Sequence, residues 1–443
     1  MKQRQSEAPK KWLAWWQLSL LGIGCIIGTG FFLGSSIAIQ MTGPSVLLSF
    51  ILAACGSYIV FDVLAKLTMM DPEKGSFRTY AKKAYGRWAG FTSGWVYWSS
   101  ELLIMGSQLT ALSIFSRYWF PDLSMWIFTI FFGLLGILVV LTGSKGFDRI
   151  ENVFALMKLA AILMFVILSL AAIFGIFGGG KGQFNIPNHY HDFFPTGLKG
   201  LWSSLIYGYY TFGGIEIVGL LAIRLKNKQD IAKSGRVMLI LLSIIYLISI
   251  GLVITMMSWK AVDTNESPFI TALHSFNLAF VPHVFNGVLI IAGFSTMVAS
   301  LYAITSILVT LAEDRDAPAI FSKKVKKDIA LPAIGFSTIG LVISIIFAFI
   351  MPNKIYTYFT TAASLMLLYN WLFILFSSGR LIKDMGKLKQ WIGIVLLFIA
   401  ISGACVHQTS RVGFFISIGF ITIIILLTLI MKQKWKKEDF AQS

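Results

Sequence analysis

The stretch Gly22-Ile23-Gly24-Cys25-Ile26-Ile27-Gly28-Thr29-Gly30 lies inside the first long apolar segment of the chain. A helix that crosses a bilayer satisfies its own backbone, and these glycines lower helix propensity where lipid demands an unbroken helix. We therefore expect non-helical backbone beside a cavity in mid-membrane. A half-helix that begins at Gly28-Thr29-Gly30 would point free N–H groups and a positive dipole end at that cavity, which suits a carboxylate or another anion.

The same glycines allow a second interpretation. Gly24 and Gly28 form a G-x-x-x-G pattern, which is typical of close packing between membrane helices. A nucleotide-binding loop is disfavoured, because Ile27 stands where G-x-G-x-x-G needs its third glycine and no strand pattern precedes it.

The composition is that of a polytopic membrane protein. Of the 443 residues, 56% are hydrophobic and 13% are charged, and the mean hydropathy is +0.77, outside the range of soluble domains. The net charge of +17 does not indicate a nucleic-acid partner, because the basic residues lie in short loops and not on a soluble face. The basic N-terminus precedes an apolar run without a cleavage pattern, so we expect no removable signal peptide.

Apolar runs of about 20 residues, the length that a bilayer core requires, predict twelve spans. They lie near residues 17–41, 43–65, 88–116, 124–144, 152–177, 199–223, 234–257, 284–311, 331–351, 355–377, 390–408 and 411–431. Most of the 37 lysines and arginines then fall on the side of the two termini, with few, such as Lys181 and Lys354, on the other. By the positive-inside rule, both termini are predicted to be cytoplasmic and the chain to lie in the cell membrane.

A second break is predicted in the sixth span, at Tyr210-Thr211-Phe212-Gly213-Gly214-Ile215-Glu216. Spans 1 and 6 run in opposite directions, and each has glycines about half way along. This is the pattern of two inverted five-helix repeats that meet at a mid-membrane site. The alternative is that membrane helices are simply rich in glycine.

Three ionisable residues fall inside spans, where they are costly and usually functional. Glu216 follows the second break. Glu101 and Gln108, in span 3, share one helix face and should look into the bundle together. Lys158, in span 5, could donate to carbonyls exposed by the first break when protonated and release them when neutral, which would make it a proton switch. The alternatives are snorkelling for Lys158, a structural bond to unwound backbone for Glu216 and a neutral acid in a packed interface for Glu101.

We find no metal or cofactor motif. His189, His191, His274 and His283 lie in connecting loops without an acidic partner at ligand spacing. The three cysteines, Cys25, Cys55 and Cys405, fall in apolar segments and are interpreted as small buried side chains. No nucleophile motif lies in the spans, so we do not expect an enzyme.

The ordered motifs resemble an amino acid permease of the amino acid–polyamine–organocation superfamily, close to its bacterial amino acid transporter branch, over nearly the whole chain. They are Gly28-Thr29-Gly30-Phe31, Gly43-Pro44-Ser45, Gly75-Ser76-Phe77 with Tyr80, Trp88-Ala89-Gly90-Phe91, Gly94-Trp95, Tyr97-Trp98, Phe154-Ala155-Leu156-Met157-Lys158, Phe212-Gly213-Gly214-Ile215-Glu216, Ser300-Leu301-Tyr302, Leu311-Ala312-Glu313-Asp314 and Ala317-Pro318.

The resemblance implies an all-α fold of twelve transmembrane helices, a five-plus-five inverted repeat with broken helices 1 and 6 and two added helices. The corresponding segments are a tail (1–16), the first repeat (17–177), the second repeat (199–377), helices 11 and 12 (390–431) and a second tail (432–443).

The resemblance also implies site residues. The substrate carboxylate would meet the amides of Thr29 and Gly30, and the α-amino group the carbonyls of Ile26, Tyr210 and Gly213. Tyr210 would resemble an aromatic lid. Lys158 matches a lysine that implies proton coupling, and Glu216 matches the family's glutamate of span 6. The predicted site also includes Gly28 and Gln108 as substrate-binding residues and Glu101 as a proton-coupling residue.

Two departures from the family pattern stand out. Relatives carry a glutamate where this chain has Gln108, and its own acid is Glu101, two turns earlier at a position that is usually apolar. At the end of span 6 the usual Gly-Glu is replaced by Ile223-Arg224. This charge reversal puts in doubt any gating role carried over for the inner end of span 6.

We therefore expect a secondary transporter that imports an α-amino acid by proton symport, with amino acid, protons and membrane lipid as its partners. A neutral, apolar amino acid is favoured, on the premise that Glu101 and Glu216 serve structure or coupling and leave no free acid for a cationic side chain. An exchanger without proton coupling, a cationic amino acid permease and a non-transporting sensor are the alternatives.

Overall fold

The computed structural model describes residues 12–176, 185–274, 280–324, 329–350, 355–382 and 386–442. The basic residues before Trp12, and the predicted outer-side residues Lys181 and Lys354, lie outside the described residues. Within these ranges the chain is nearly all helical and forms no strand, apart from one isolated bridge between Leu13 and Leu225.

The first predicted span is divided into three short helices. They are α1 (Trp15–Ile26), α2 (Thr29–Phe32) and α3 (Gly34–Thr42), which continue through the 3₁₀ turn η1 (Gly43–Ser45) into α4 (Val46–Met70). The next elements are α5 (Phe77–Tyr85), α6 (Arg87–Arg117), α7 (Met125–Val140), α8 (Gly143–Ile173) and α9 (Tyr190–Phe193).

The sixth predicted span is divided as well. It consists of α10 (Gly197–Tyr210), α11 (Ile215–Leu221) and the 3₁₀ turn η2 (Ala222–Arg224). The remaining elements are α12 (Asp230–Met256), η3 (Trp259–Ala261), α13 (Pro268–His274), α14 (Val281–Glu313), η4 (Ala319–Ser322), α15 (Leu331–Ile350), α16 (Ile355–Leu381), α17 (Lys387–Gly403) and α18 (Gln408–Gln442).

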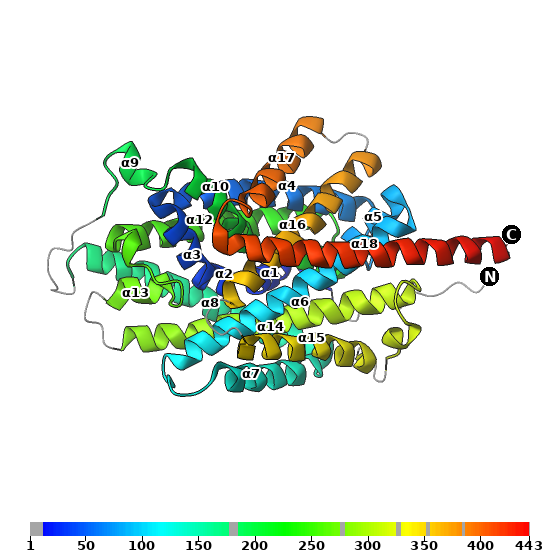
Figure 1. Ribbon diagram of the computed structural model, residues 1–443, viewed down its shortest axis with the longest axis horizontal. Helices are drawn as coiled ribbons and strands as arrows, with labels where there is room; N and C mark the ends of the chain where they lie inside the picture. Colours follow the sequence, from blue (N-terminus) through cyan, green and yellow to red (C-terminus); the bar gives the residue numbers. More distant parts are fainter. Residues whose placement is uncertain are drawn as a thin grey trace.

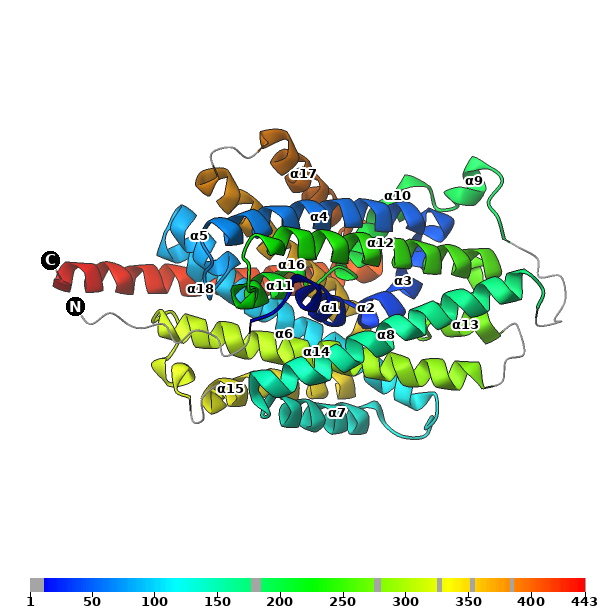
Figure 2. The same ribbon diagram turned by 180° about the vertical axis from the view of Figure 1, so that it is seen from behind.

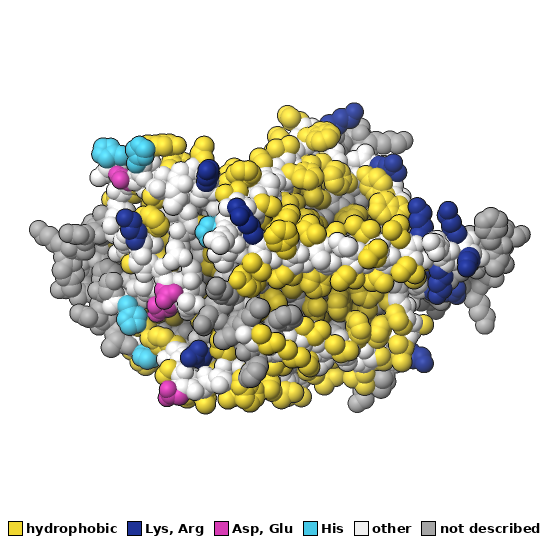
Figure 3. Space-filling view, in the orientation of Figure 1, with side chains coloured by type: hydrophobic (Ala, Val, Ile, Leu, Met, Phe, Trp, Pro, Cys, Tyr) yellow, Lys and Arg dark blue, Asp and Glu magenta, His cyan; other side chains and the backbone are white. Residues whose placement is uncertain are grey.

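Seven helical segments of the described chain are long and apolar enough to cross a membrane. Further apolar helices, such as α1 and α7, are shorter. Large hydrophobic side chains are exposed along peripheral helices, for example Leu138 on α7, Ile167 on α8 and Ile423 on α18. Figure 3 shows such side chains spread over the middle of the molecule, with lysines and arginines gathered around the projecting end of α18. This is the surface of a multi-pass membrane protein, whose outer helices face lipid.

The two broken helices lie at the centre of the bundle. Figures 1 and 2 show α1, α2 and α11 enclosed by long helices, with α5 near the projecting end of α18 and α9 and α13 at the opposite end. α6 packs along both α14 and α16, whereas α1 packs between α8 and α12. Non-helical backbone at this depth is tolerated because it is buried in protein and not exposed to lipid.

Ion pairs connect the elements at the end of the molecule where α5 lies. The side chain of Arg78 on α5 is fully buried and pairs with Asp314, at 2.8 Å, and with Asp316, both of which follow α14. Arg87, at the start of α6, also reaches Asp316, at 2.9 Å. These bonds hold α5, α6 and the segment after α14 together at that end of the molecule.

Candidate functional site

The first break has a defined geometry. α1 closes with the bond from the Ile27 amide to the Ile23 carbonyl, and Ile27 and Gly28 then adopt extended backbone before α2 begins at Thr29. Gly28 is needed for a close approach, because a Cβ atom there would lie 2.6 Å from the Thr296 side chain on α14. Both interpretations of this stretch therefore hold: the helix is broken here, and glycine also allows a neighbouring helix to pack closely against it.

The second break is held by its own glutamate. α10 ends at Tyr210, and Gly214 takes a left-handed conformation, with φ of +111°, before α11 begins. That conformation favours glycine. The Glu216 carboxylate accepts a bond from the Gly214 amide at 2.9 Å and another from Trp371 Nε1, on α16, at 3.1 Å. Glu216 thus makes a hydrogen bond to unwound backbone, which is the structural alternative predicted for this residue from the sequence.

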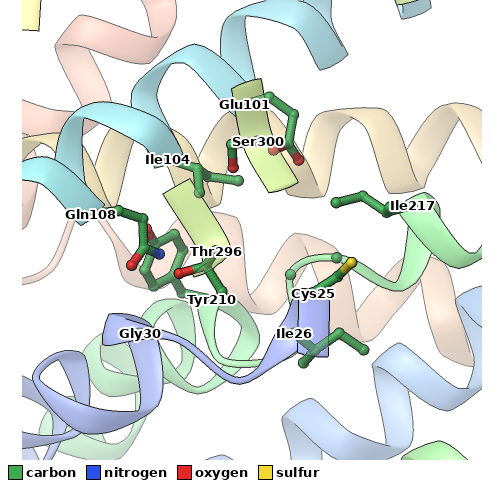
Figure 4. Close-up of a pocket in the computed structure, with 12 residues that line it drawn as sticks. Cys25, Ile26, Gly30, Glu101, Ile104, Gln108, Tyr210, Ile217, Thr296 and Ser300 are labelled. Carbon is green, nitrogen blue, oxygen red and sulfur yellow. The ribbon is translucent and has the colours of Figure 1, made fainter. Parts of the chain in front are cut away.

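A cavity lies where the two breaks meet, with a volume of about 20 Å³. That volume holds about one water molecule. Figure 4 shows Gln108 and Tyr210 toward one end of the cavity and Glu101, Cys25 and Ile217 toward the other. The walls come from α1, α2, α6, α10, α11 and α14. The lining residues are Cys25, Ile26, Gly30, Glu101, Ile104, Gln108, Tyr210, Gly213, Gly214, Ile217, Thr296 and Ser300.

Gln108 lies at the polar end of this cavity and contacts Thr29, which stands at the start of α2 just outside the lining. Gln108 Oε1 accepts bonds from the Thr29 amide, at 3.2 Å, and from the Thr29 hydroxyl, at 2.7 Å. The Tyr356 hydroxyl donates to the Thr29 carbonyl at 2.9 Å. Tyr210 shares a hydrogen bond with Ser107 and lays its ring against Gly30, where a Cβ atom would lie 2.8 Å from the ring. The start of α2 is therefore fixed from α6 and α16.

Glu101 occupies the other end of the cavity. Its side chain is 1% exposed, yet neither carboxyl oxygen has a hydrogen-bond partner among the described residues. The side chains of Tyr97, Ser300 and Glu216 lie nearby but outside hydrogen-bond geometry. The Tyr97 hydroxyl is likewise buried without a partner in the described chain.

Lys158 lies behind the first break, inside the helix bundle. Its side chain is fully buried, and its ammonium group donates to the Gly24 carbonyl of α1. Glu151, one oxygen of which lies 3.7 Å from Lys158 Nζ, also accepts bonds of 2.7 and 2.8 Å from the Ser295 hydroxyl. The snorkelling alternative for Lys158 is wrong, because the side chain turns into the bundle.

The structure brings most of the predicted site residues together at the cavity: Ile26, Gly30, Glu101, Gln108, Tyr210 and Gly213. Four others do not line it: Gly28, Thr29, Lys158 and Glu216. They lie at or beside the breaks and contact neighbouring elements as described above.

Sequence reasoning missed several residues of this region. Glu151 was not recognised as the partner of Lys158, although a spacing of seven residues on one helix would have indicated a shared face. Ser295, Thr296 and Ser300 on α14 were missed as well; their helical spacing was the available signal. Cys55 and Cys405 are exposed and not buried as predicted, because Cys55 lies on an outward face of α4 and Cys405 lies in the turn after α17.

No group of three or more His, Cys, Asp or Glu side chains in the described ranges could hold a metal ion. His189 lies beside the short helix α9, where its amide nitrogen, and not its ring, contacts Asp192.

Arg224, the charge reversal at the end of the sixth span, has an acidic partner. It forms a two-pronged ion pair with Asp148 on α8, one bond of which measures 2.9 Å. The Leu13 amide donates to the Arg224 carbonyl at 2.8 Å, and the Lys226 amide donates to the Leu13 carbonyl at 3.0 Å. The segment before α1 and the end of α11 are thereby fastened to each other and to α8.

Comparison with known proteins identifies the family. The model of the amino acid permease family matches residues 17–443. The chain is 52% identical to the uncharacterized transporter YcgH of Bacillus subtilis, over 99% of both chains. It is 28% identical to the gamma-aminobutyric acid permease of the same organism, over 95% of this chain and 90% of the relative.

A solved structure has a similar fold. The crystal structure of MhsT in complex with L-phenylalanine superposes with a TM-score of 0.63, covering 91% of this chain and all of that chain at 15% identity. The full-length family match and the close relative together show that this chain belongs to the amino acid permease family and is a multi-pass membrane protein of amino acid transport.

Proposed function

We propose that this protein imports an α-amino acid across the cytoplasmic membrane by proton symport with alternating access. The observation that carries the proposal is a cavity at the meeting point of two helix breaks, with a buried lysine fastened to the first of them. Broken helices around a midplane cavity are the arrangement by which secondary transporters bind an ionic substrate.

In this proposal the substrate backbone binds at the breaks. Its carboxylate meets the amides of Thr29 and Gly30 beside Gly28, and its α-amino group meets the carbonyls of Ile26, Tyr210 and Gly213, which end the helices that flank the cavity. The Gln108 oxygen that now accepts from Thr29 would give way to the carboxylate. Because the cavity measures only about 20 Å³, binding requires the surrounding helices to part.

Lys158 is the proposed proton carrier. When protonated, it holds the Gly24 carbonyl and keeps the end of α1 in place; when neutral, it releases that carbonyl and frees α1 to move. Glu151 stabilises the protonated form through its charge. Glu216 couples the release of α1 to the second break, because it accepts a hydrogen bond from the Gly214 amide. Glu101, in the cavity wall, is a neighbour of Glu216.

The proposed topology is the five-plus-five repeat. Residues 17–177 form the first repeat, 199–377 the second, and 390–431 the two added helices, with tails 1–16 and 432–443 in the cytoplasm. Twelve crossings place the basic connections on the side of both termini, which supports this orientation. The breaks in spans 1 and 6 occupy corresponding positions of the two repeats, as an inverted repeat requires.

The sequence favours a neutral side chain on the premise that both acids serve structure or coupling. Glu216 meets that premise through its bonds to Gly214 and Trp371. Glu101 does not meet it through any hydrogen bond of the described chain. A neutral amino acid is therefore less strongly supported as the substrate.

The test is uptake of labelled amino acids into proteoliposomes, with and without an inward proton gradient, for the wild type and Lys158→Ala. The panel includes neutral, basic and acidic α-amino acids together with γ-aminobutyrate. We expect accumulation that requires the gradient and is lost in Lys158→Ala.

Uptake that ignores the gradient but requires a counter-substrate inside would replace symport by exchange and would make Lys158 structural. Glu73→Gln, in the loop between α4 and α5, is the control for a general effect of a charge change, since Glu73 pairs with Lys83 at the surface.

A further inference from the structure

The buried carboxyl group of Glu101 is the feature of the cavity that the proposed backbone contacts do not use. A buried polar group without a hydrogen bond is costly, and a charged one costs more. Two acids meet here, yet only Glu216 accepts hydrogen bonds in the described chain; the hydroxyls of Tyr97 and Ser300 lie near Glu101 without bonding it. An apolar side chain at position 101 would avoid the cost, so the carboxyl group is poorly explained as packing.

The described surroundings of Glu101 offer no cation. Tyr97 from α6, Ser300 from α14 and Glu216 from α11 are its polar neighbours, and Cys25, Ile104 and Ile217 complete the wall. Lys158 is engaged by the Gly24 carbonyl and Glu151. A cation that enters the cavity from outside would thus meet a carboxyl group with both oxygens available.

The position of Glu101 relative to the backbone site fixes the length of the ligand. Glu101 and Gln108 lie two turns apart on one face of α6, which is about 10 Å at 1.5 Å per residue. Gln108 marks the end where the substrate carboxylate is proposed to bind Thr29. A long basic side chain, with a hydrogen bond at each end of the molecule, covers this separation, whereas a short side chain such as that of alanine does not.

We infer that Glu101 is the acceptor for a positively charged group at the end of the substrate side chain, so that the site takes a long basic amino acid. This inference rests on the proposed function. Glu101 binds the ammonium or guanidinium group as a carboxylate, Ser300 lies beside that group, and Ile104 and Ile217 line the aliphatic part of the side chain. A cationic ligand supplies the hydrogen bonds that the buried carboxyl group lacks, and so removes the free-energy cost of burying it. A neutral ligand leaves that cost in place, so the cavity selects the cation.

The experiment compares uptake of L-lysine, L-arginine and L-ornithine with that of L-alanine, L-leucine and L-phenylalanine in proteoliposomes. The proteins are the wild type, Glu101→Gln, Glu101→Asp and the control Asp122→Asn. Asp122 is exposed in the loop after α6, so its variant tests for general attraction of cations. We expect the wild type and Asp122→Asn to prefer the basic amino acids.

Glu101→Gln should lower the ratio of basic to neutral amino acid uptake about 10-fold or more, as the loss of a charged hydrogen bond predicts. Glu101→Asp keeps the charge and should keep the preference. Thermal unfolding of the wild type, with and without L-lysine, measures binding without transport; L-lysine should stabilise the wild type more than L-leucine does.

Two results would overturn the inference. One is a wild type that takes up and is stabilised by neutral amino acids alone. The other is an unchanged ratio of basic to neutral uptake in Glu101→Gln, which would leave Glu101 as a neutral acid that shares a proton with Glu216. If no amino acid of either class is transported, the proposed function fails instead, so the two failures are distinguishable.

Discussion

The ammonium group of Lys158 on α8 donates a hydrogen bond to the backbone carbonyl of Gly24 on α1. α1 makes its last backbone bond from Ile27 to Ile23, so Lys158 binds the next carbonyl along, at the point where the helix stops. A charge on one helix thus holds the broken end of another, and this is the bond that the proposed proton switch would release.

The space beside Gly24 gives a first prediction. A Cβ atom there would lie 2.7 Å from Glu151 Oε1 and 3.0 Å from the Ala155 side chain. Gly24→Ala should therefore displace Glu151, loosen the Lys158 bond and destabilise the protein by about 1–3 kcal/mol, as overpacking does. Thermal unfolding in detergent and gradient-driven uptake measure the effect.

Gly251→Ala is the matched control for this prediction, since a Cβ atom at Gly251 on α12 meets nothing within 4 Å. That variant should leave uptake unchanged and be at least as stable as the wild type, because alanine favours the helix by about 0.5–1 kcal/mol. Equal effects of the two substitutions would show that the crowding at Gly24 does not matter.

The Thr29 hydroxyl gives a second prediction. Thr29→Val removes the 2.7 Å bond to Gln108 while keeping the shape of the side chain, and leaves a buried amide oxygen short of a donor. The free energy of unfolding should fall by about 1–3 kcal/mol, and the KM for the amino acid should rise because the start of α2 is less fixed. Thr29→Ser keeps the hydroxyl and should lose less than half as much; an equal loss would show that the hydroxyl bond to Gln108 contributes no more than the methyl group does.

The ion pair of Arg224 and Asp148 predicts a charge-swap result. Arg224→Asp alone places two acids together and removes a half-buried pair, which should destabilise the protein by about 2 kcal/mol. The double variant Asp148→Arg with Arg224→Asp should recover most of the stability and uptake. If it behaves as the sum of the two single variants, the pair does not link α8 to the end of α11.

Asp314, outside the membrane, predicts how stability depends on pH. Burial raises the pKa of its carboxyl, but bonds from Lys82 and Arg78 outweigh burial and bring the pKa below its usual value of 3.8. A carboxyl with a lowered pKa stabilises the folded state above the unfolded pKa and loses this effect as the pH falls through the folded pKa.

Asp314→Asn should therefore lower the Tm by the same amount at pH 5, 6.5 and 8, and by less in acid below about pH 3.8. Thermal unfolding across this range, with Asp122→Asn as the control, measures it. A difference that already disappears between pH 8 and pH 5 would contradict this assignment and would assign the pH dependence to another group.

Much of the architecture could be predicted from local sequence. Apolar runs fix where helices lie in a membrane, and glycines at 24, 28, 213 and 214 fix where two of them are interrupted, because a backbone without side chains resists helix formation and permits close approach. Helical spacing also placed Glu101 and Gln108 on one face of span 3. These are properties of short stretches of chain.

Only the tertiary structure decided which groups meet. The contacts of Lys158 with Gly24, Arg224 with Asp148, and Trp371 with Glu216 join residues that lie on different elements and far apart in the chain. Helix packing alone brings these residues within bonding distance. The sequence by itself determined a membrane bundle with two breaks and a set of costly buried charges. The packing decided which of those charges are paired and that Glu101, in the described chain, is left without a hydrogen-bond partner at the cavity, because pairing depends on distances between helices that no local pattern encodes.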